Sequence, residues 1–220
     1  MHDRDRRILL DFVELCALPQ CPICALVSKA ELRTLQVYCA EGAGDEMRRA
    51  DIRAARGLCV RHSDLLQNAR DAMAAAVTAF DVLTNLQRDL QAVSQARWRR
   101  RSRMTKPLPC PVCADVRRYD RAVCAGVVAW ADQPELTGAL ATSAGLCAPH
   151  LRWLVAHTNV PTAILDAQHV AWSRLHAELA EFIRKRDDRF RHEGDADERD
   201  AWKRAWRTIA GSVEVPDTKE

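Results

Sequence analysis

The sequence predicts an all-α protein in which one helical unit occurs twice. Apolar side chains recur at helical spacing through the long segments, and in residues 3–17 Ile8, Phe12 and Cys16 would share one face. No convincing run of alternating polar and apolar residues indicates a β-strand. Two short cysteine-containing motifs each occur twice, in the same order and at nearly the same offset. Such a repeat is typical of a duplicated unit with pseudo-two-fold symmetry.

The helical periodicity predicts elements throughout the chain. In the first half, the expected helices cover residues 3–17, 25–39, 45–56 and 62–100. Gly57 would end the third of these, and a proline-marked linker follows over residues 105–109. In the second half, the expected helices cover residues 112–131, 134–143, 151–157, 161–191 and 197–210. Pro134 suits the first turn of its helix, and Gly145 follows the end of that helix.

The repeated motifs divide the chain into two halves. The first motif, which we call CPxC, occurs as Cys21-Pro22-Ile23-Cys24 and as Cys110-Pro111-Val112-Cys113. The second motif, GLCxxH, occurs as Gly57-Leu58-Cys59-Val60-Arg61-His62 and as Gly145-Leu146-Cys147-Ala148-Pro149-His150. We therefore expect a first repeat over residues 1–104 and a second over 105–220, which also carries a C-terminal helix. The sequence leaves open whether the repeats form two domains or share one core.

The residue types in these motifs predict a metal site of three cysteines and one histidine in each repeat. Two cysteines three positions apart can direct two thiolates at one tetrahedral ion, and a Cys-x-x-His turn adds a thiolate and an imidazole. Both motifs are expected at helix starts, where the helix dipole favours the thiolate. The expected sites are Cys21, Cys24, Cys59 and His62 in the first repeat, and Cys110, Cys113, Cys147 and His150 in the second.

Zinc is the expected ion, with two ions per chain. A closed site of three thiolates and one imidazole is typical of structural zinc and has no open position for a substrate. An iron–sulfur cluster is the competing interpretation, because cysteine dominates its ligation too. Cys16 could add a fourth thiolate near the first site, but no equivalent cysteine precedes Cys110. The alternative that these cysteines are simply buried apolar side chains is disfavoured by the duplication of both motifs.

Several other residues have both a structural and a functional interpretation. Cys16, Cys39 and Cys124 lie outside the motifs and are either buried small side chains or oxidant-sensing thiols. The basic run, which we define as Arg97, Trp98, Arg99, Arg100, Arg101 and Arg103, is either a solvated helix end or a nucleic-acid contact. The second-half histidines, His157, His169 and His176, are interpreted as ordinary helix residues rather than as another metal site. In the C-terminal helix, Trp202, Trp206 and Ile209 share a face that packs on the core or binds a partner.

The composition and the motifs that are missing limit the classes of function to be considered. A net charge of +3 is too small for a whole-protein field that attracts nucleic acid. The sequence has no long apolar stretch that would span a membrane and no secretory signal, so a cytoplasmic location is expected. It also lacks the phosphate-binding, serine-hydrolase and metalloprotease motifs of common enzymes. A non-catalytic adaptor or accessory role with a protein partner or a homo-oligomer is therefore favoured. The alternatives are a redox protein, as a thiol–zinc switch or iron–sulfur carrier, and a nucleic-acid-binding regulator.

The paired CPxC and GLCxxH motifs, the long helices and the C-terminal tryptophan helix that ends at Ala210-Gly211 resemble an uncharacterised bacterial family. Its members are helical proteins with duplicated Cys/His metal-binding motifs, and the resemblance covers nearly the whole chain. It implies metal binding by the eight motif residues and adds no activity. The alanines after each CPxC motif, Ala25 and Ala114, depart from the glycine of ordinary zinc knuckles.

Overall fold

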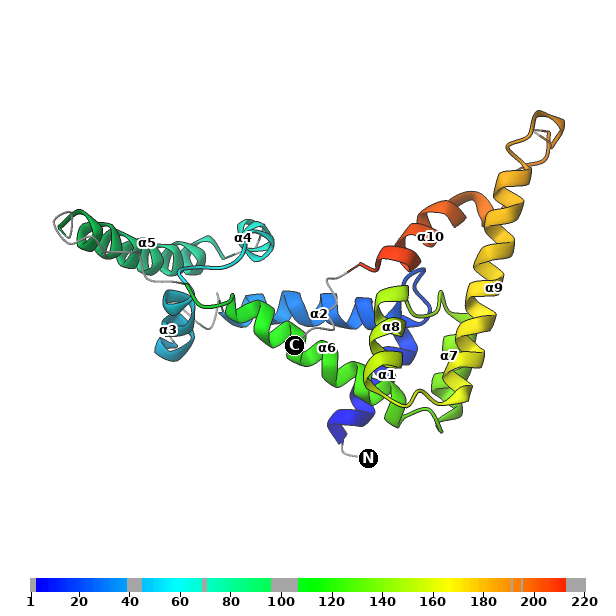
Figure 1. The fold of residues 1–220 in the computed structure, drawn as a ribbon, viewed down its shortest axis with the longest axis horizontal. Helices are drawn as coiled ribbons and strands as arrows, with labels where there is room; N and C mark the ends of the chain where they lie inside the picture. The colour runs from blue at the N-terminus through cyan, green and yellow to red at the C-terminus, as the bar shows by residue number, and fades with distance from the viewer. Residues whose placement is uncertain are drawn as a thin grey trace. The chain divides into compact units, whose positions relative to one another are not determined.

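In the residues that it describes, the computed structural model contains ten α-helices, which confirms the all-α class (Figure 1). It describes residues 3–38, 45–68, 71–95, 107–190, 192–194 and 196–212. Within these ranges no residue belongs to a β-strand. None of the helices in this part of the chain is long and apolar enough to cross a lipid bilayer. The internal duplication stays a prediction.

The chain forms two compact units. Unit 1 consists of Met1–Ser28 and Tyr119–Glu220, and unit 2 consists of Lys29–Arg118. Each unit therefore takes residues from both of the expected repeats, 1–104 and 105–220. The borders between the units fall within two continuous helices, α2 (Pro22–Gln36) and α6 (Pro111–Ala129). Each of these helices begins directly after the first cysteine of a CPxC motif, with proline at its first position, where the missing amide proton costs nothing.

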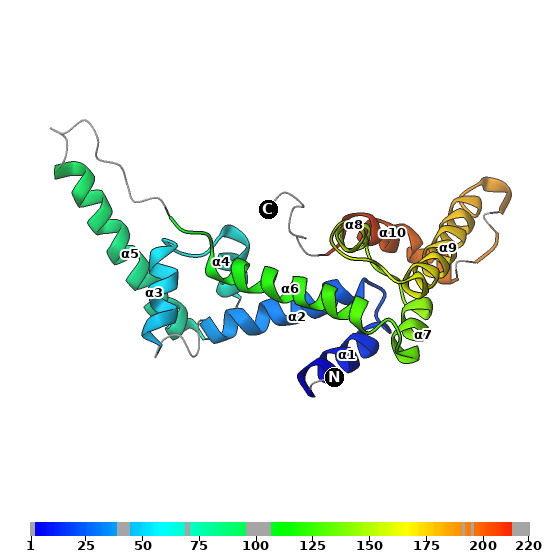
Figure 2. The same ribbon diagram turned by 60° about the horizontal axis from the view of Figure 1, so that its bottom comes forward.

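Unit 1 is built around the pair α7 and α9. It contains α1 (Asp3–Leu15), α7 (Pro134–Thr142), α8 (Ala148–His157), α9 (Thr162–Arg184) and α10 (Ala201–Ala210). Figures 1 and 2 both show α7 alongside α9, and α10 contacts α9 and α8. The largest fully buried side chains of this unit include Phe12, Ile23, Leu136, Leu140, Leu146, Leu154 and Ile164. These residues come from five helices and from the segment before α8, so several elements contribute apolar side chains to the core.

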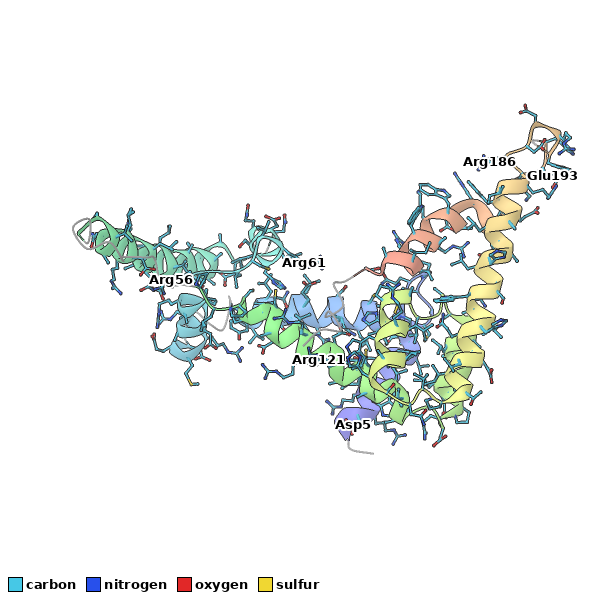
Figure 3. The ribbon with its side chains drawn as sticks, viewed as in Figure 1. Asp5, Arg56, Arg61, Arg121, Arg186 and Glu193 are labelled. Atoms are coloured by element: carbon cyan, nitrogen blue, oxygen red, sulfur yellow. The ribbon has the colours of Figure 1, made fainter. Side chains whose placement is uncertain are left out.

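The helix expected over residues 161–191 ends earlier, at Arg184. Ion pairs tie the following turn back to the helix: Arg184 contacts Glu193, and the Nζ of Lys185 lies 2.7 Å from Oε1 of Glu198. Figure 3 shows Glu193 in this turn beyond the end of α9. The helix expected over 197–210 begins as a short 3₁₀ turn, Asp197–Asp200, and continues as α10.

Unit 2 contains α3 (Glu46–Ala54), α4 (Val60–Gln67) and α5 (Ala72–Gln95), together with parts of α2 and α6. Its buried core is Leu35, Tyr38, Ile52 and Val112, with Leu58, Leu65, Leu66, Val82 and Val116 packed against it. These core residues come from all five helices and from the segment before α4. Burial of their apolar surface is the main term that stabilises this unit.

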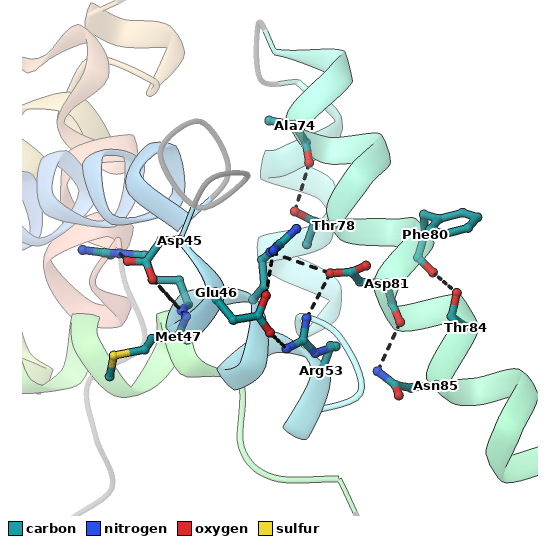
Figure 4. Close-up of polar contacts among 12 residues, drawn as sticks. Asp45, Glu46, Met47, Arg53, Ala74, Thr78, Phe80, Asp81, Thr84 and Asn85 are labelled. Carbon is teal, nitrogen blue, oxygen red and sulfur yellow. Dashed lines mark hydrogen bonds and ion pairs between the residues drawn. The ribbon is translucent and has the colours of Figure 1, made fainter.

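Ion pairs join α3 to α5 along the side of this core (Figure 4). Nη1 of Arg53 donates to Oδ2 of Asp81 at 3.1 Å, and Nε of Arg56 donates to Oδ2 of Asp89 at 2.7 Å. The side chain of Asp45 caps α3 by accepting the amide of Met47 at 2.9 Å. The pairs are part-buried and add a modest stabilisation to the contact between α5 and the region of α3 and its C-terminal turn.

The prediction of a single helix over residues 62–100 is wrong, because α4 ends at Gln67 and α5 begins at Ala72. Polar side chains at the junction satisfy backbone groups locally. Nδ2 of Asn68 donates to the carbonyl of Asp64 at 2.9 Å, and Oδ1 of Asp71 accepts the amide of Ala74 at 2.9 Å. Asparagine and aspartate favour such local hydrogen bonds over a continuous helix.

Candidate metal centres

Four ligand atoms converge in unit 1, and we call this group centre 1. Its members are Cys21, Cys24, Cys147 and His150, whose ligand atoms lie within 4.8 Å of one another. Sγ of Cys24 is 3.7 Å from Sγ of Cys147, and Nδ1 of His150 is 3.0 Å from Sγ of Cys147. A tetrahedral zinc ion with bonds of about 2.3 Å to sulfur places its sulfurs about 3.8 Å apart. The observed spacing therefore fits such an ion.

Four equivalent atoms converge in unit 2, and we call this group centre 2. Its members are Cys59, His62, Cys110 and Cys113, again within 4.8 Å of one another. Sγ of Cys59 is 3.6 Å from Sγ of Cys113, and Nδ1 of His62 is 3.1 Å from Sγ of Cys59. In both centres the thiols and the imidazole come from the starts of two helices, α2 and α8 in centre 1 and α6 and α4 in centre 2.

The expected grouping of these ligands is wrong. The sequence predicted one centre from Cys21, Cys24, Cys59 and His62, and another from Cys110, Cys113, Cys147 and His150. In the structure each CPxC motif meets the GLCxxH motif of the other expected repeat. The physical reason is non-local packing, because the start of α2 lies against α8 in unit 1, and the start of α6 lies against α4 in unit 2. The eight residues are unchanged, and their role as metal ligands stays a prediction.

A carboxylate lies behind each histidine. Nε2 of His150 is 3.1 Å from Oδ1 of Asp120, and Nε2 of His62 is 3.0 Å from Oε1 of Glu31. In each case Nδ1 faces the thiols, so the carboxylate contacts the nitrogen that would not bind the ion. A carboxylate in this position orients a metal-binding imidazole and increases its basicity. All four of these side chains are buried.

Glu31 is held in turn by Arg61, which projects from the first turn of α4 (Figure 3). Nε and Nη2 of Arg61 donate to the two carboxylate oxygens of Glu31, each at 2.7 Å. Burial opposes ionisation of Glu31, but the bonds from Arg61 and the contact with His62 outweigh it and lower the pKa of Glu31 to about 2. The carboxylate is therefore ionised at neutral pH and available to His62.

The thiols and imidazoles perturb one another strongly when no ion is present. Burial opposes charge on both histidines, yet contacts with thiols and carboxylates raise the pKa of His62 to about 10 and that of His150 to about 12. Burial opposes ionisation of Cys110 as well, but His62 lowers the pKa of Cys110 to about 6. Burial and the neighbouring thiol of Cys59 raise the pKa of Cys113 to about 12. A cation in each centre would replace the protons that these groups carry.

Sequence reasoning missed Glu31 and Asp120. A signal was present, because each carboxylate occurs ten residues after the first cysteine of its CPxC motif. Each also stands on the helix that the motif begins, α2 for Glu31 and α6 for Asp120. The two helices thus supply thiols to one centre and a carboxylate to the histidine of the other centre.

Reciprocal neutral substitutions should test the role of these carboxylates. Glu31→Gln is expected to weaken zinc binding at centre 2 by roughly 10- to 100-fold, because His62 loses its anionic partner. Asp120→Asn is expected to do the same at centre 1. Competition with a chelator measures the affinity, and alkylation of the released cysteines identifies the centre. Each variant is the control for the other, and equal weakening of both centres in either variant would contradict the assignment.

The glycine and leucine of the second GLCxxH motif position Cys147. The Leu146 side chain is fully buried, and its backbone is clamped by Gln168 of α9. Oε1 of Gln168 accepts the amide of Leu146 at 2.7 Å, and Nε2 of Gln168 donates to its carbonyl at 3.2 Å. Nε1 of Trp172 donates to the same carbonyl at 3.1 Å. Gly145 takes a φ of +74°, a conformation that costs little for glycine.

Gly145→Ala is expected to lower the free energy of unfolding of unit 1 by about 2–4 kcal/mol, from the left-handed backbone and overpacking. A Cβ at this position would lie 2.8 Å from Nε2 of Gln168 and 2.9 Å from Cβ of Ala171. Gly138→Ala in α7 is the matched control, because its Cβ would meet no atom within 4 Å. That change should stabilise the helix by roughly 0.5–1 kcal/mol. Urea denaturation measures the free energy of unfolding of both variants. Equal changes in the two variants would contradict the role given to the contacts between Gly145 and Gln168.

A backbone amide contacts a sulfur of centre 1, and two cysteines outside the motifs are buried in the same unit. The amide of Ser212, just after α10, donates to Sγ of Cys24 at 3.4 Å. Cys124 lies beside Asp120, with its Sγ 3.7 Å from Oδ1. Burial raises the pKa of Cys124, and burial raises the pKa of Cys16 to about 12. Both thiols are buried, which agrees with the interpretation of small core side chains. Cys39 lies outside the described residues.

The remaining sequence candidates do not join the centres. The basic run of Arg97, Trp98, Arg99, Arg100, Arg101 and Arg103 lies outside the described residues, so its nucleic-acid role stays a prediction. The ring of His157 stacks on Trp153 at 4.5 Å, while His169 and His176 are exposed on α9. Among the described residues none of these three histidines belongs to a metal-type cluster. The three apolar residues of α10, Trp202, Trp206 and Ile209, are exposed to 46%, 65% and 55%.

Comparison with known proteins gives a family but no activity. The model of a family of unknown function, DUF6062, matches residues 15–216 of the chain. No curated protein and no solved structure matches the chain. The matched region includes all eight cysteine and histidine residues of the two centres, and both carboxylates.

Proposed function

We propose that this chain, which belongs to the DUF6062 family of unknown function, binds one zinc ion in each centre and acts as a non-catalytic helical adaptor. The observation that carries the proposal is the convergence of three thiols and one imidazole nitrogen in each unit, at distances that suit a tetrahedral ion. A carboxylate behind each imidazole adds the usual outer partner of a metal-binding histidine.

The proposed ions have a structural role. Each centre gathers the starts of two helices that are far apart in the chain, and its four protein ligands would fill a tetrahedral coordination sphere. Because the separate helices meet at the ligands, the free energy of metal binding becomes part of the free energy of folding. Zinc is favoured over an iron–sulfur cluster because a histidine stands with three thiols in both centres, whereas clusters are mostly held by cysteine alone.

The adaptor role is supported by the exposed face of α10. Trp202 and Trp206 project large apolar surface into solvent, and Lys203 and Arg207 stand beside them as exposed cations. Exposed tryptophan is uncommon on monomers without a partner and frequent at protein interfaces. We therefore place the proposed protein-binding surface on this helix.

Metal analysis tests the proposal directly. Protein purified without added metal is expected to contain two zinc ions per chain and to show no visible absorption band. Replacement of zinc by cobalt should give the intense visible spectrum of tetrahedral thiolate coordination in both centres. Iron in the purified protein, together with broad visible absorption, would instead indicate an iron–sulfur cluster in place of zinc. Purified protein that contains no metal and takes up none when metal is added would contradict the proposal.

A further inference from the structure

The two centres differ in their exposure to solvent. In centre 1, Cys24, Cys147 and His150 are each 0% exposed, and Cys21 is 6% exposed. In centre 2, all three cysteines are partly exposed, and only His62 is buried. The two ligand sets are chemically the same, so exposure is the property that separates them. A thiolate reacts with a dissolved oxidant only if the oxidant can reach its sulfur.

The chain around the ligands shows the same contrast. Cys110 of centre 2 follows an exposed irregular segment, residues 107–109, in which Leu108 is 61% exposed. One backbone bond, from the amide of Leu108 to the carbonyl of Ala54 at 3.3 Å, ties that segment to the end of α3. In centre 1 the fully buried sulfur of Cys24 accepts the amide of Ser212 at 3.4 Å. Local opening therefore costs less at centre 2 than at centre 1.

Two sulfurs of centre 2 from separate helix starts also lie close to each other. Sγ of Cys59 and Sγ of Cys113 lie 3.6 Å apart and come from different helices, α4 and α6. Oxidation of one thiolate to a sulfenic acid would leave a second thiolate within reach to resolve it. A bond between these two residues would remove two of the four ligands from the ion.

We propose that centre 2 is a peroxide-responsive thiol site, in which Cys59 and Cys113 form a disulfide and release the metal, while centre 1 keeps its ion. This inference rests on the proposed function, because it requires a metal in each centre. The responsive site would be the three partly exposed cysteines of unit 2, and the oxidant a hydroperoxide. Centre 1 would serve as the permanent structural site.

Disulfide formation at centre 2 would consume one molecule of hydrogen peroxide in two steps. One thiolate attacks a peroxide oxygen, the O–O bond breaks, and a sulfenic acid and one water molecule form after uptake of protons. The second thiolate attacks the sulfenic sulfur and displaces its oxygen, which leaves as a second water molecule. Two thiolates and two protons thus reduce one hydrogen peroxide to two waters. Zinc is not oxidised, and it leaves as the hydrated ion because one thiolate and one imidazole bind it weakly.

The test uses the whole zinc-loaded chain, with its metal content measured first. Hydrogen peroxide is added in small excess, and a chromogenic zinc chelator follows metal release with time. The expected result is release of one of the two zinc ions, with the other retained. Addition of a dithiol reductant and zinc should restore the original content. Unreacted protein with chelator alone is the control for spontaneous release.

Peptide mapping after alkylation identifies the reacting residues without any substitution. Trypsin cleaves after Arg56 and Arg61, so a disulfide from Cys59 joins two separate peptides, and fragmentation of the joined pair shows whether its partner is Cys113 or Cys110. A Cys110–Cys113 disulfide stays within one peptide and, like a Cys59–Cys110 disulfide, would overturn the assignment. A Cys59–Cys113 disulfide supports the proposal. Release of both ions at the same rate, earlier oxidation of Cys21, Cys24 or Cys147, or release of neither ion would overturn it. Protein that binds no zinc at the outset would instead contradict the proposed function, on which this inference depends.

Discussion

Cys24→Ser is expected to abolish metal binding at centre 1 and to unfold unit 1, while centre 2 keeps its ion. Cys24 is fully buried, and its sulfur lies 3.7 Å from Sγ of Cys147 and 3.5 Å from Nδ1 of His150. A serine hydroxyl is a poor zinc ligand at neutral pH. The apparent free energy of structural zinc binding is about 10–16 kcal/mol, which is comparable to the whole stability of a domain.

The matched control is Cys16→Ala, which changes another buried cysteine of unit 1 that lies outside the centre. Its expected cost is about 1 kcal/mol, from lost packing alone. Zinc content and the unfolding transition followed by circular dichroism measure both variants. Cys24→Ser should retain one zinc ion per chain and lose one of two transitions. A Cys24→Ser protein with two ions and unchanged unfolding would show that Cys24 is not a ligand.

Local chemistry made the helix starts predictable, together with the cysteines and histidines that converge in the two centres. Pro22 and Pro111 directly follow a cysteine, so both CPxC motifs indicated a helix that begins within the motif. Gly145 was expected to end one helix, but α7 ends at Thr142 with Ser143 as its cap. The structure shows another reason for glycine at position 145, which is its positive φ and the close approach of Gln168. These signals operate within a few residues, and periodicity or turn chemistry is enough to read them.

The exchange of ligands between repeats could not be predicted from such signals. Both CPxC motifs present the same ligand atoms, and so do both GLCxxH motifs, so coordination chemistry favours neither pairing. The choice is made by long-range packing, in which residues next to the ligands, such as Ile23 and Leu146, are fully buried. Apolar periodicity shows which face of a helix is buried, but it does not name the helix that covers that face.

Glu31 and Asp120 were missed for a different reason. A single carboxylate in a helix is normally a solvated side chain, and its residue type carries no sign of a buried partner. Only the equal spacing from the two CPxC motifs distinguishes these two residues in the sequence. The structure adds the decisive observation, that each lies about 3 Å from the outer nitrogen of a ligand histidine.

Zinc affinity is expected to rise at least about 100-fold for each pH unit between pH 7 and pH 9, because at least two protons leave each centre when the ion binds. In metal-free centre 2, His62 with a pKa of about 10 and Cys113 with a pKa of about 12 both carry a proton in this range. Cys110, with a pKa of about 6, is already ionised. Protons therefore stabilise the metal-free form, and raising the pH favours the metal-bound form.

Centre 1 should follow the same slope. The pKa of His150 is raised to about 12, despite a burial penalty, by Asp120 and the neighbouring thiols, and burial raises the pKa of Cys21 well above its usual value. Chelator competition at pH 7, 8 and 9, corrected for protonation of the chelator, gives the affinity. A pH indicator in weak buffer independently counts the protons released per zinc, which should be at least about two. Below pH 6 Cys110 also gains a proton, so the slope at centre 2 should steepen. An affinity that stays constant across this range, with no proton release, would mean that the thiols and imidazoles do not bind the ion.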